Sequence, residues 1–309
     1  MYLRGLARRE RVPDNAGVLL ALLLVIAGCG GGDGGTVDAS ADASNDAGPR
    51  GSITIGGDRP ARVVLPFDPS GPLPVVVLLH GYSISGTVQD AYFRTTRRAR
   101  DNGFALVLPD GTIDDTGNRF WNALPEWMGR TYALDDVAYI LGLVDELAGV
   151  IDVDPARIYL VGHSNGAFMA HRIACDAADR ITAFVSLAGS GYLDPADCVA
   201  SVPVSLLSVH GDADDTIPYA GTTGYPGVVE ITERWAARDG CDITMPTAGD
   251  PIDADGAIPG AETEVVRYDV GCTTGFDVDL WTIRGGGHLP AITDEAIDGL
   301  IAWLLAHSR

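Results

Sequence analysis

Short apolar runs alternate with amphipathic segments along most of this chain. The runs are rich in Val, Leu, Ile and Phe and are nearly continuous, which is typical of β-strands that are covered on both faces. Such strands are predicted at 75–79, 104–108, 157–161, 184–188, 204–209, 265–269 and 277–283. Two earlier runs, 52–55 and 62–65, predict an antiparallel pair that opens the fold.

The segments between these runs carry helical patterns. In 135–150 the apolar residues recur at three- and four-residue spacing, as on one face of an amphipathic helix. Further helices are predicted at 167–178, 227–239 and 291–307, and a polar, Arg-rich surface helix at 87–101. Strands that alternate with helices favour an α/β class with a mostly parallel central sheet and helices on both faces. Functional residues then belong on loops at the carboxyl ends of the strands.

The first residues of the chain do not fit this pattern. An Arg-containing start precedes an apolar run at 18–28, which is too short for a spanning helix because spanning takes about 20 apolar residues. The run leads into Cys29 through small residues and resembles the bacterial lipobox. Residues 1–28 are therefore predicted to be a lipoprotein signal peptide, and Cys29 the lipidated residue. An ordinary signal peptide followed by an incidental Cys is the alternative.

Composition and charge complete the domain organisation. Residues 29–50 are rich in Gly, Asp, Ala and Ser and predict a flexible tether, whereas 51–309 has the length of one α/β domain. All 21 basic residues are Arg, and the net charge is −21. So acidic a chain will not bind nucleic acid or an anionic membrane by charge. We expect an exported, envelope-anchored bacterial lipoprotein that is monomeric and meets the membrane only through its lipid.

Four further cysteines follow Cys29: Cys175, Cys198, Cys241 and Cys272. An even number in an exported protein indicates two disulfides. Of the three possible connectivities, sequence proximity favours Cys175–Cys198 and Cys241–Cys272. A zinc site is excluded because no two of these cysteines have C-x-x-C spacing.

The segment Gly162-His163-Ser164-Asn165-Gly166 carries the main chemical signal. It fits the pattern G-x-S-x-G between an apolar strand and a helix, which is the setting of a nucleophile elbow. There a sharp turn exposes the Ser hydroxyl, and the following helix points its N-terminal N–H groups at the reacting centre. A plain Gly-rich turn is the alternative.

A serine nucleophile needs a base and an orienting acid, in the chain order Ser, acid, His. His288 follows the flexible Gly285-Gly286-Gly287 after the last strand, and we assign it as the base. His210 ends a strand and is interpreted as structural. The loop after it offers Asp212, Asp214 and Asp215 as the acid, and position alone does not choose among them.

The tetrahedral intermediate of such a reaction needs N–H donors for its oxyanion. One is predicted at the backbone of Asn165, the residue after the nucleophile. The other is expected in the turn after strand 75–79, where Tyr82 is the first choice and Ser83 the second.

Together these segments resemble the polyhydroxybutyrate depolymerase-like esterases, which overlap with feruloyl and acetylxylan esterases of carbohydrate esterase family one. The resemblance covers roughly 50–309. Besides the triad segments, it rests on His80-Gly81, on the segment 210–219 from His210-Gly211 through Asp214 to Tyr219, and on the continuation of the serine motif to Met169. It implies an α/β-hydrolase fold and hydrolysis of carboxylic esters through an acyl-enzyme, with no cofactor and no metal. It also places the acid at Asp214 and supports both cysteine pairings.

The chain departs from the family beside the expected cleft. Leu289-Pro290-Ala291 stands where the family usually has Trp-Pro-Gly, and Tyr82-Ser83-Ile84-Ser85 replaces a Gly-rich, often Cys-containing loop. Leu289 and Trp121 are predicted to contact substrate, with a core position as the alternative for Trp121. The substrate stays open between polyhydroxyalkanoate, feruloylated or acetylated polysaccharide, and synthetic polyester.

Two other functions share parts of this pattern. A serine peptidase of the same fold has the same triad order, but it usually carries a large extra domain. A non-catalytic binding lipoprotein could use the same scaffold, but it should have lost one of Ser164, Asp214 and His288. A calcium role for Asp250, Asp253 and Asp255 fits an EF-hand only in part, and we interpret this segment as a surface loop.

Overall fold

We describe a computed structural model of the chain in which residues 51–126 and 130–309 are placed. All of these residues belong to one compact unit, Ala47–Arg309. The predicted signal peptide, the lipidated Cys29 and the tether lie outside the described residues. Among the residues that are described, no helix is both long and apolar enough to cross a membrane.

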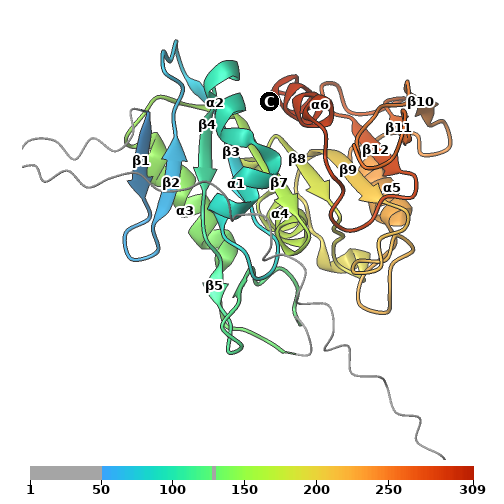
Figure 1. Cartoon of the computed structure of the whole chain (residues 1–309), viewed down its shortest axis with the longest axis horizontal. Coiled ribbons are helices and arrows are strands. Elements are labelled where there is room, and N and C mark those ends of the chain that lie inside the picture. The colour runs from blue at the N-terminus through green and yellow to red at the C-terminus, as the bar shows by residue number, and fades with distance from the viewer. Residues whose placement is uncertain (1–50, 127–129) are drawn as a thin grey trace, which may run out of the picture. The chain divides into compact units, whose positions relative to one another are not determined.

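The described part of the chain forms a ten-stranded sheet in the order β1-β2-β4-β3-β7-β8-β9-β12-β11-β10 (Figure 1). Its strands are β1 (Ser52–Ile55), β2 (Ala61–Val64), β3 (Leu73–Leu79), β4 (Ala105–Leu108), β7 (Val153–His163), β8 (Ala183–Leu187), β9 (Ser205–Gly211), β10 (Thr247–Ala248), β11 (Thr263–Tyr268) and β12 (Val278–Ile283). The six strands from β4 to β12 run parallel, while the two strands at each edge pair antiparallel. The predicted opening pair and the mostly parallel centre are confirmed.

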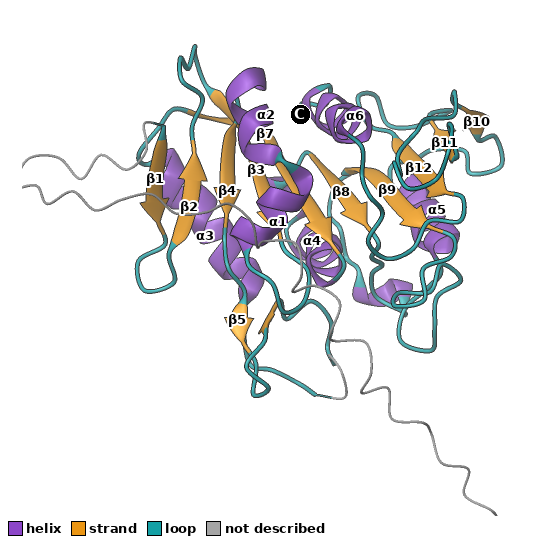
Figure 2. Cartoon of the chain, in the orientation of Figure 1, coloured by secondary structure: helices purple, strands orange, loops and turns teal. Residues whose placement is uncertain are grey.

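Helices cover both faces of this sheet (Figure 2). They are α1 (Gly86–Phe93), α2 (Thr95–Asn102), α3 (Asp136–Ala148), α4 (Asn165–Asp176), α5 (Val228–Arg238) and α6 (Asp294–Leu305), with 3-10 turns at Ala178–Arg180 and Pro195–Asp197. Because side chains alternate along a strand, Val75 and Val77 of β3 join the core under α3, α4 and α5. Val76 and Leu78 join the core under α1, α2 and α6.

The parallel strands fix where function can lie. The loops after β3, β7, β9 and β12 all lie at the carboxyl ends of the strands, which coincide because these strands are parallel. Ser164 follows β7, Asp214 follows β9 and His288 follows β12. Three segments that are far apart in the sequence therefore meet at the carboxyl ends of the strands.

The predicted single surface helix at 87–101 is wrong in two respects. The segment is two helices, α1 and α2, separated at Arg94, whose φ of 53° is left-handed. Arg98 is buried, and its guanidinium donates to the carbonyls of Phe93 and Arg94 at the carboxyl end of α1. A polar sequence pattern does not distinguish an arginine that faces water from one that caps a helix.

The sequence also missed a small ribbon after β4. Strands β5 (Thr112–Ile113) and β6 (Arg119–Phe120) pair antiparallel and form a second sheet. Two-residue strands leave too short a pattern to detect. This ribbon contacts the turn that follows β3.

The cysteines pair as predicted. Cys175 of α4 is bonded to Cys198, and Cys241, just beyond α5, is bonded to Cys272 after β11. Each bridge ties the end of an α-helix to a loop, and closing such loops restricts the unfolded chain.

Asp239, at the carboxyl end of α5, is fully buried. One carboxylate oxygen accepts the Val204 N–H at 3.1 Å, and the other has no partner among the described residues. Burial raises the pKa of Asp239 to about 7, against the lowering effect of the Val204 hydrogen bond. Between the ordinary pKa of 3.8 and about 7 the unfolded chain releases this proton while the folded chain keeps it. Stability from this group therefore falls as the pH rises through that window.

We expect Asp239→Asn to raise the thermal midpoint above pH 7 and to change it little below pH 4. Asn still accepts the Val204 N–H but carries no charge to bury. The upper limit of the gain is about 4 kcal/mol, from roughly three pKa units. Thermal unfolding of both proteins at the two pH values checks this, and an equal shift at both would contradict it.

Candidate active site

Ser164 lies in a strained turn between β7 and α4. Its backbone has φ 54° and ψ −122°, outside the usual regions for a side-chain-bearing residue. The two flanking glycines make the turn possible. A Cβ on Gly162 would lie 2.3 Å from the Gly166 carbonyl oxygen, and one on Gly166 would lie 2.2 Å from the Leu79 carbonyl oxygen. Neither position therefore has room for a side chain, as a nucleophile elbow requires.

The three residues predicted to form the triad lie within hydrogen-bonding distance. His288 Nε2 is 3.0 Å from Ser164 Oγ, and His288 Nδ1 is 2.8 Å from Asp214 Oδ2. A carboxylate accepts, so Nδ1 carries the proton and Nε2 accepts from the serine hydroxyl. This tautomer is the one in which imidazole can act as base toward Ser164.

Asp214 accepts three hydrogen bonds and lies close to the ring of His210. Its Oδ1 accepts the N–H groups of Thr216 and Ile217, while Oδ2 lies 3.2 Å from His210 Nε2 as well as near His288. Burial alone would raise the pKa of Asp214, but the hydrogen bonds from His210, His288 and Ile217 outweigh it and hold the pKa well below its usual range. The carboxylate stays charged. His210 also donates to the Ile217 carbonyl, which agrees with the structural role expected for it.

The substrate-contact prediction for Trp121 is wrong, because its ring is fully buried. Its Nε1 donates to the His80 carbonyl at 3.0 Å, and its backbone N–H and carbonyl both bond the Asn165 side-chain amide. Trp121 therefore links the residue after the nucleophile to the strand end beside it. An aromatic residue near a cleft motif gives no sequence signal for which way it faces.

The turn after β3 is held by the β5–β6 ribbon. The Tyr82 hydroxyl donates to Asp114 Oδ2 at 2.7 Å, and the Ser83 N–H donates to the Arg119 carbonyl at 2.8 Å. Ser83 has φ 68°, a left-handed conformation. Because the Ser83 N–H is committed to the ribbon, the second-choice oxyanion donor is ruled out in this state. Tyr82 stays a prediction.

Leu289 lies next to the base and is 53% exposed, so its side chain is available to a substrate. Asp255, considered above as a calcium ligand, is instead buried, and its Oδ1 accepts the N–H groups of Ala257 and Ala291. No group of three candidate metal ligands occurs in the residues that the structure describes.

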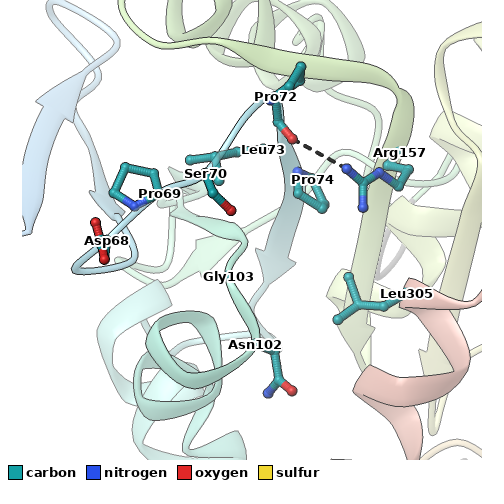
Figure 3. Close-up of a pocket in the computed structure, with 10 residues that line it drawn as sticks. All are labelled: Asp68, Pro69, Ser70, Pro72, Leu73, Pro74, Asn102, Gly103, Arg157 and Leu305. Carbon is teal, nitrogen blue, oxygen red and sulfur yellow. Dashed lines mark hydrogen bonds between the residues drawn. The ribbon is translucent and has the colours of Figure 1, made fainter.

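A pocket of about 400 Å³ lies at the amino ends of the central strands (Figure 3). Leu73 at the start of β3, Gly103 before β4 and Leu305 at the end of α6 line it. Two charged side chains line it, Asp68 and Arg157, and Arg157 is paired with Asp154 and donates to the Pro72 carbonyl. This pocket shares no residue with the triad.

No family model matches the chain. Among curated proteins, a putative esterase named NocK from Nocardia uniformis subsp. tsuyamanensis is 28% identical over 231 residues, covering 70% of this chain and 64% of the relative. Feruloyl esterase B from Piromyces equi is 27% identical over 259 residues, covering 78% and 44%. Poly(3-hydroxyalkanoate) depolymerase C from Paucimonas lemoignei is 24% identical over 168 residues, covering 52% and 39%. The chain thus spans less than two thirds of each of these relatives.

Among solved structures, an acetyl xylan esterase from Aspergillus awamori superposes with a TM-score of 0.62 at 16% identity, covering 82% of this chain and 98% of that one. A carboxylesterase from Mesorhizobium loti has a TM-score of 0.53 at 18% identity, covering 83% and 99%. Likeness at this level establishes the fold. The chain therefore has the α/β-hydrolase fold and is related in sequence to proteins named feruloyl esterase, acetylxylan esterase and polyhydroxyalkanoate depolymerase, as its motifs predicted.

Proposed function

We propose that this chain is a serine hydrolase of carboxylic esters. The observation that carries the proposal is the pair of consecutive hydrogen bonds that joins Ser164 Oγ to His288 and His288 to Asp214, with distances of 3.0 and 2.8 Å. The strained backbone of Ser164 and the start of α4 directly behind it support the same chemistry.

His288 Nε2 takes the proton from Ser164 as its Oγ attacks the ester carbonyl carbon. The Asn165 N–H, at the start of α4, and the Tyr82 N–H stabilise the oxyanion that forms. His288 then gives its proton to the departing alkoxide, which leaves an acyl-enzyme on Ser164. Water deprotonated by His288 attacks this acyl group and releases the acid. Asp214 stabilises the imidazolium in both halves, and no cofactor is needed.

The substrate class we propose is an ester of a plant polysaccharide, feruloyl or acetyl, or a polyester. The names of the sequence relatives support these classes. The exposed Leu289 beside the base is the candidate contact for the acyl or alcohol group. A peptidase is disfavoured because these relatives carry esterase and depolymerase names, and a non-catalytic role because the triad is assembled.

Ser164→Ala is expected to abolish hydrolysis of p-nitrophenyl acetate and butyrate while the circular dichroism spectrum stays unchanged. Removal of the nucleophile should lower kcat by roughly 10⁴-fold or more. The assay panel adds methyl ferulate, acetylxylan, hydroxybutyrate oligomers and a peptide amide. Full activity in the variant would sink the assignment, and preferential cleavage of the amide would favour the peptidase.

Tyr82→Phe tests the second oxyanion donor. Loss of the hydroxyl bond to Asp114 should loosen the turn and lower kcat by about three- to tenfold with KM little changed. Tyr139→Phe is the matched control, since it removes a hydroxyl bond to the Arg59 carbonyl away from the triad. Identical kinetics in the two variants would show that the hydroxyl bond to Asp114 does not hold the turn in its catalytic position.

We propose further that the protein is exported and held in the cell envelope by a lipid on Cys29, with 29–50 as tether, and that it works as a monomer. The lipobox-like sequence before Cys29 supports the export and the lipid anchor. In a bacterial host, the full chain should sediment with membranes, and Cys29→Ser should leave the esterase soluble. A wild-type chain that stays soluble after signal cleavage would contradict the anchor.

A further inference from the structure

The base, His288, lies on a segment with little stiffness of its own. Gly285, Gly286 and Gly287 precede it, and glycine has more backbone freedom than any other residue. Catalysis needs the imidazole within a few tenths of an ångström of its working position. Neighbouring parts of the fold must therefore hold the segment 288–292, which we name the base loop.

Three side chains donate to three alternate carbonyls of the base loop. His163 Nε2 lies 3.2 Å from the His288 carbonyl oxygen, and the Tyr92 hydroxyl lies 2.7 Å from that of Pro290. Arg94 Nη2 lies 2.7 Å from the carbonyl oxygen of Ile292. The loop is held from its other side too, because the Ala291 N–H donates to Asp255 Oδ1 at 2.9 Å.

Two of these donors come from the irregular end of α1. Arg94 adopts a left-handed backbone with φ 53°, which is unfavourable for a residue with a side chain. In this position its guanidinium reaches both the Ile292 carbonyl and Asp294 Oδ1, the latter at 2.9 Å from Nε. The break between α1 and α2 thus allows contacts that a continuous helix would not make, because it turns Arg94 toward the base loop and the start of α6.

The third donor is the residue before the nucleophile. His163 is buried, and its ring centroid lies 5.2 Å from that of His288 and 5.7 Å from that of Tyr92. Burial lowers the pKa of His163 to about 3, so the ring is neutral at working pH and cannot compete as a cation for Asp214. Since a carbonyl only accepts, Nε2 carries the ring proton.

We propose that His163, Tyr92 and Arg94 act together as positioning residues that fix the catalytic base through the main chain of its loop. None of them touches the reacting atoms. The inference rests on the proposed function, because it assigns them to a reaction at Ser164. It goes beyond the triad in explaining how a base that follows three glycines keeps its place.

Tyr92→Phe is the sharpest test, because it removes one hydroxyl and leaves the ring. We expect kcat for p-nitrophenyl acetate to fall roughly tenfold with KM unchanged, as when a group that orients the base is lost. Tyr159→Phe is the matched control, since its buried hydroxyl donates to the His307 carbonyl beyond the end of α6 and does not contact the base loop. Equal kinetics in the two variants would overturn the proposal.

A second readout does not depend on any ester. The low-field proton resonance of His288 Nδ1–H in its bond to Asp214 should shift or broaden in Tyr92→Phe and stay unchanged in Tyr159→Phe. If the wild type cleaves no ester but this resonance responds, the proposed function fails and the positioning role stands. An unmoved resonance would count against the role.

His163 provides an independent variant pair. Gln keeps an N–H donor near the position of Nε2, whereas Leu removes it. We expect His163→Gln to retain most of kcat and His163→Leu to lose roughly tenfold or more, both with wild-type thermal midpoints checked first. Equal losses in the two variants would show that the ring packs and does not position.

Discussion

The close approach of α4 to the end of β3 is the constraint on which the site depends. Gly166 lies against the Leu79 carbonyl so closely that even a methyl group would collide with it. This contact sets where α4 begins, and therefore where Ser164 must turn out of β7. It also brings the start of α4 next to His80, which follows Leu79 directly. The turn at Ser164 and the turn after β3 are thus placed next to each other by one backbone contact.

The electrostatics around that contact are simple. Burial lowers the pKa of His80 to about 4 and those of His163 and His171 to about 3, so all three rings are uncharged hydrogen-bonding groups. Asp214, by contrast, is kept ionised by the donors that surround it. Asp214 therefore places a fixed negative charge beside His288. That arrangement favours the imidazolium when it forms and gives it no competing partner among the neighbouring histidines.

Sequence patterns predicted this framework because they depend on local spacing. The apolar runs predicted the parallel strands. The residues directly after these runs predicted the turn at Ser164 and the order of the three triad residues. The break at Arg94 was missed because an Arg-rich segment looks the same whether its arginines face water or reach back to carbonyls. The sequence left Trp121 open between substrate contact and a core position, because the partners that bury it, His80 and Asn165, are distant in sequence. Contacts of this kind leave no periodic trace.

The residues that differ from the family pattern lie where the fold can accommodate change. Leu289 is exposed between two positions whose carbonyls are bound by side chains, that of His288 by the buried His163 and that of Pro290 by the half-buried Tyr92. Its side chain can therefore vary while the backbone on either side stays fixed. The turn after β3 is different, because the Tyr82 hydroxyl as well as the Ser83 N–H ties it to the β5–β6 ribbon. Because the contacts on either side of Leu289 are made to main-chain carbonyls, this side chain can change without moving the backbone that carries His288.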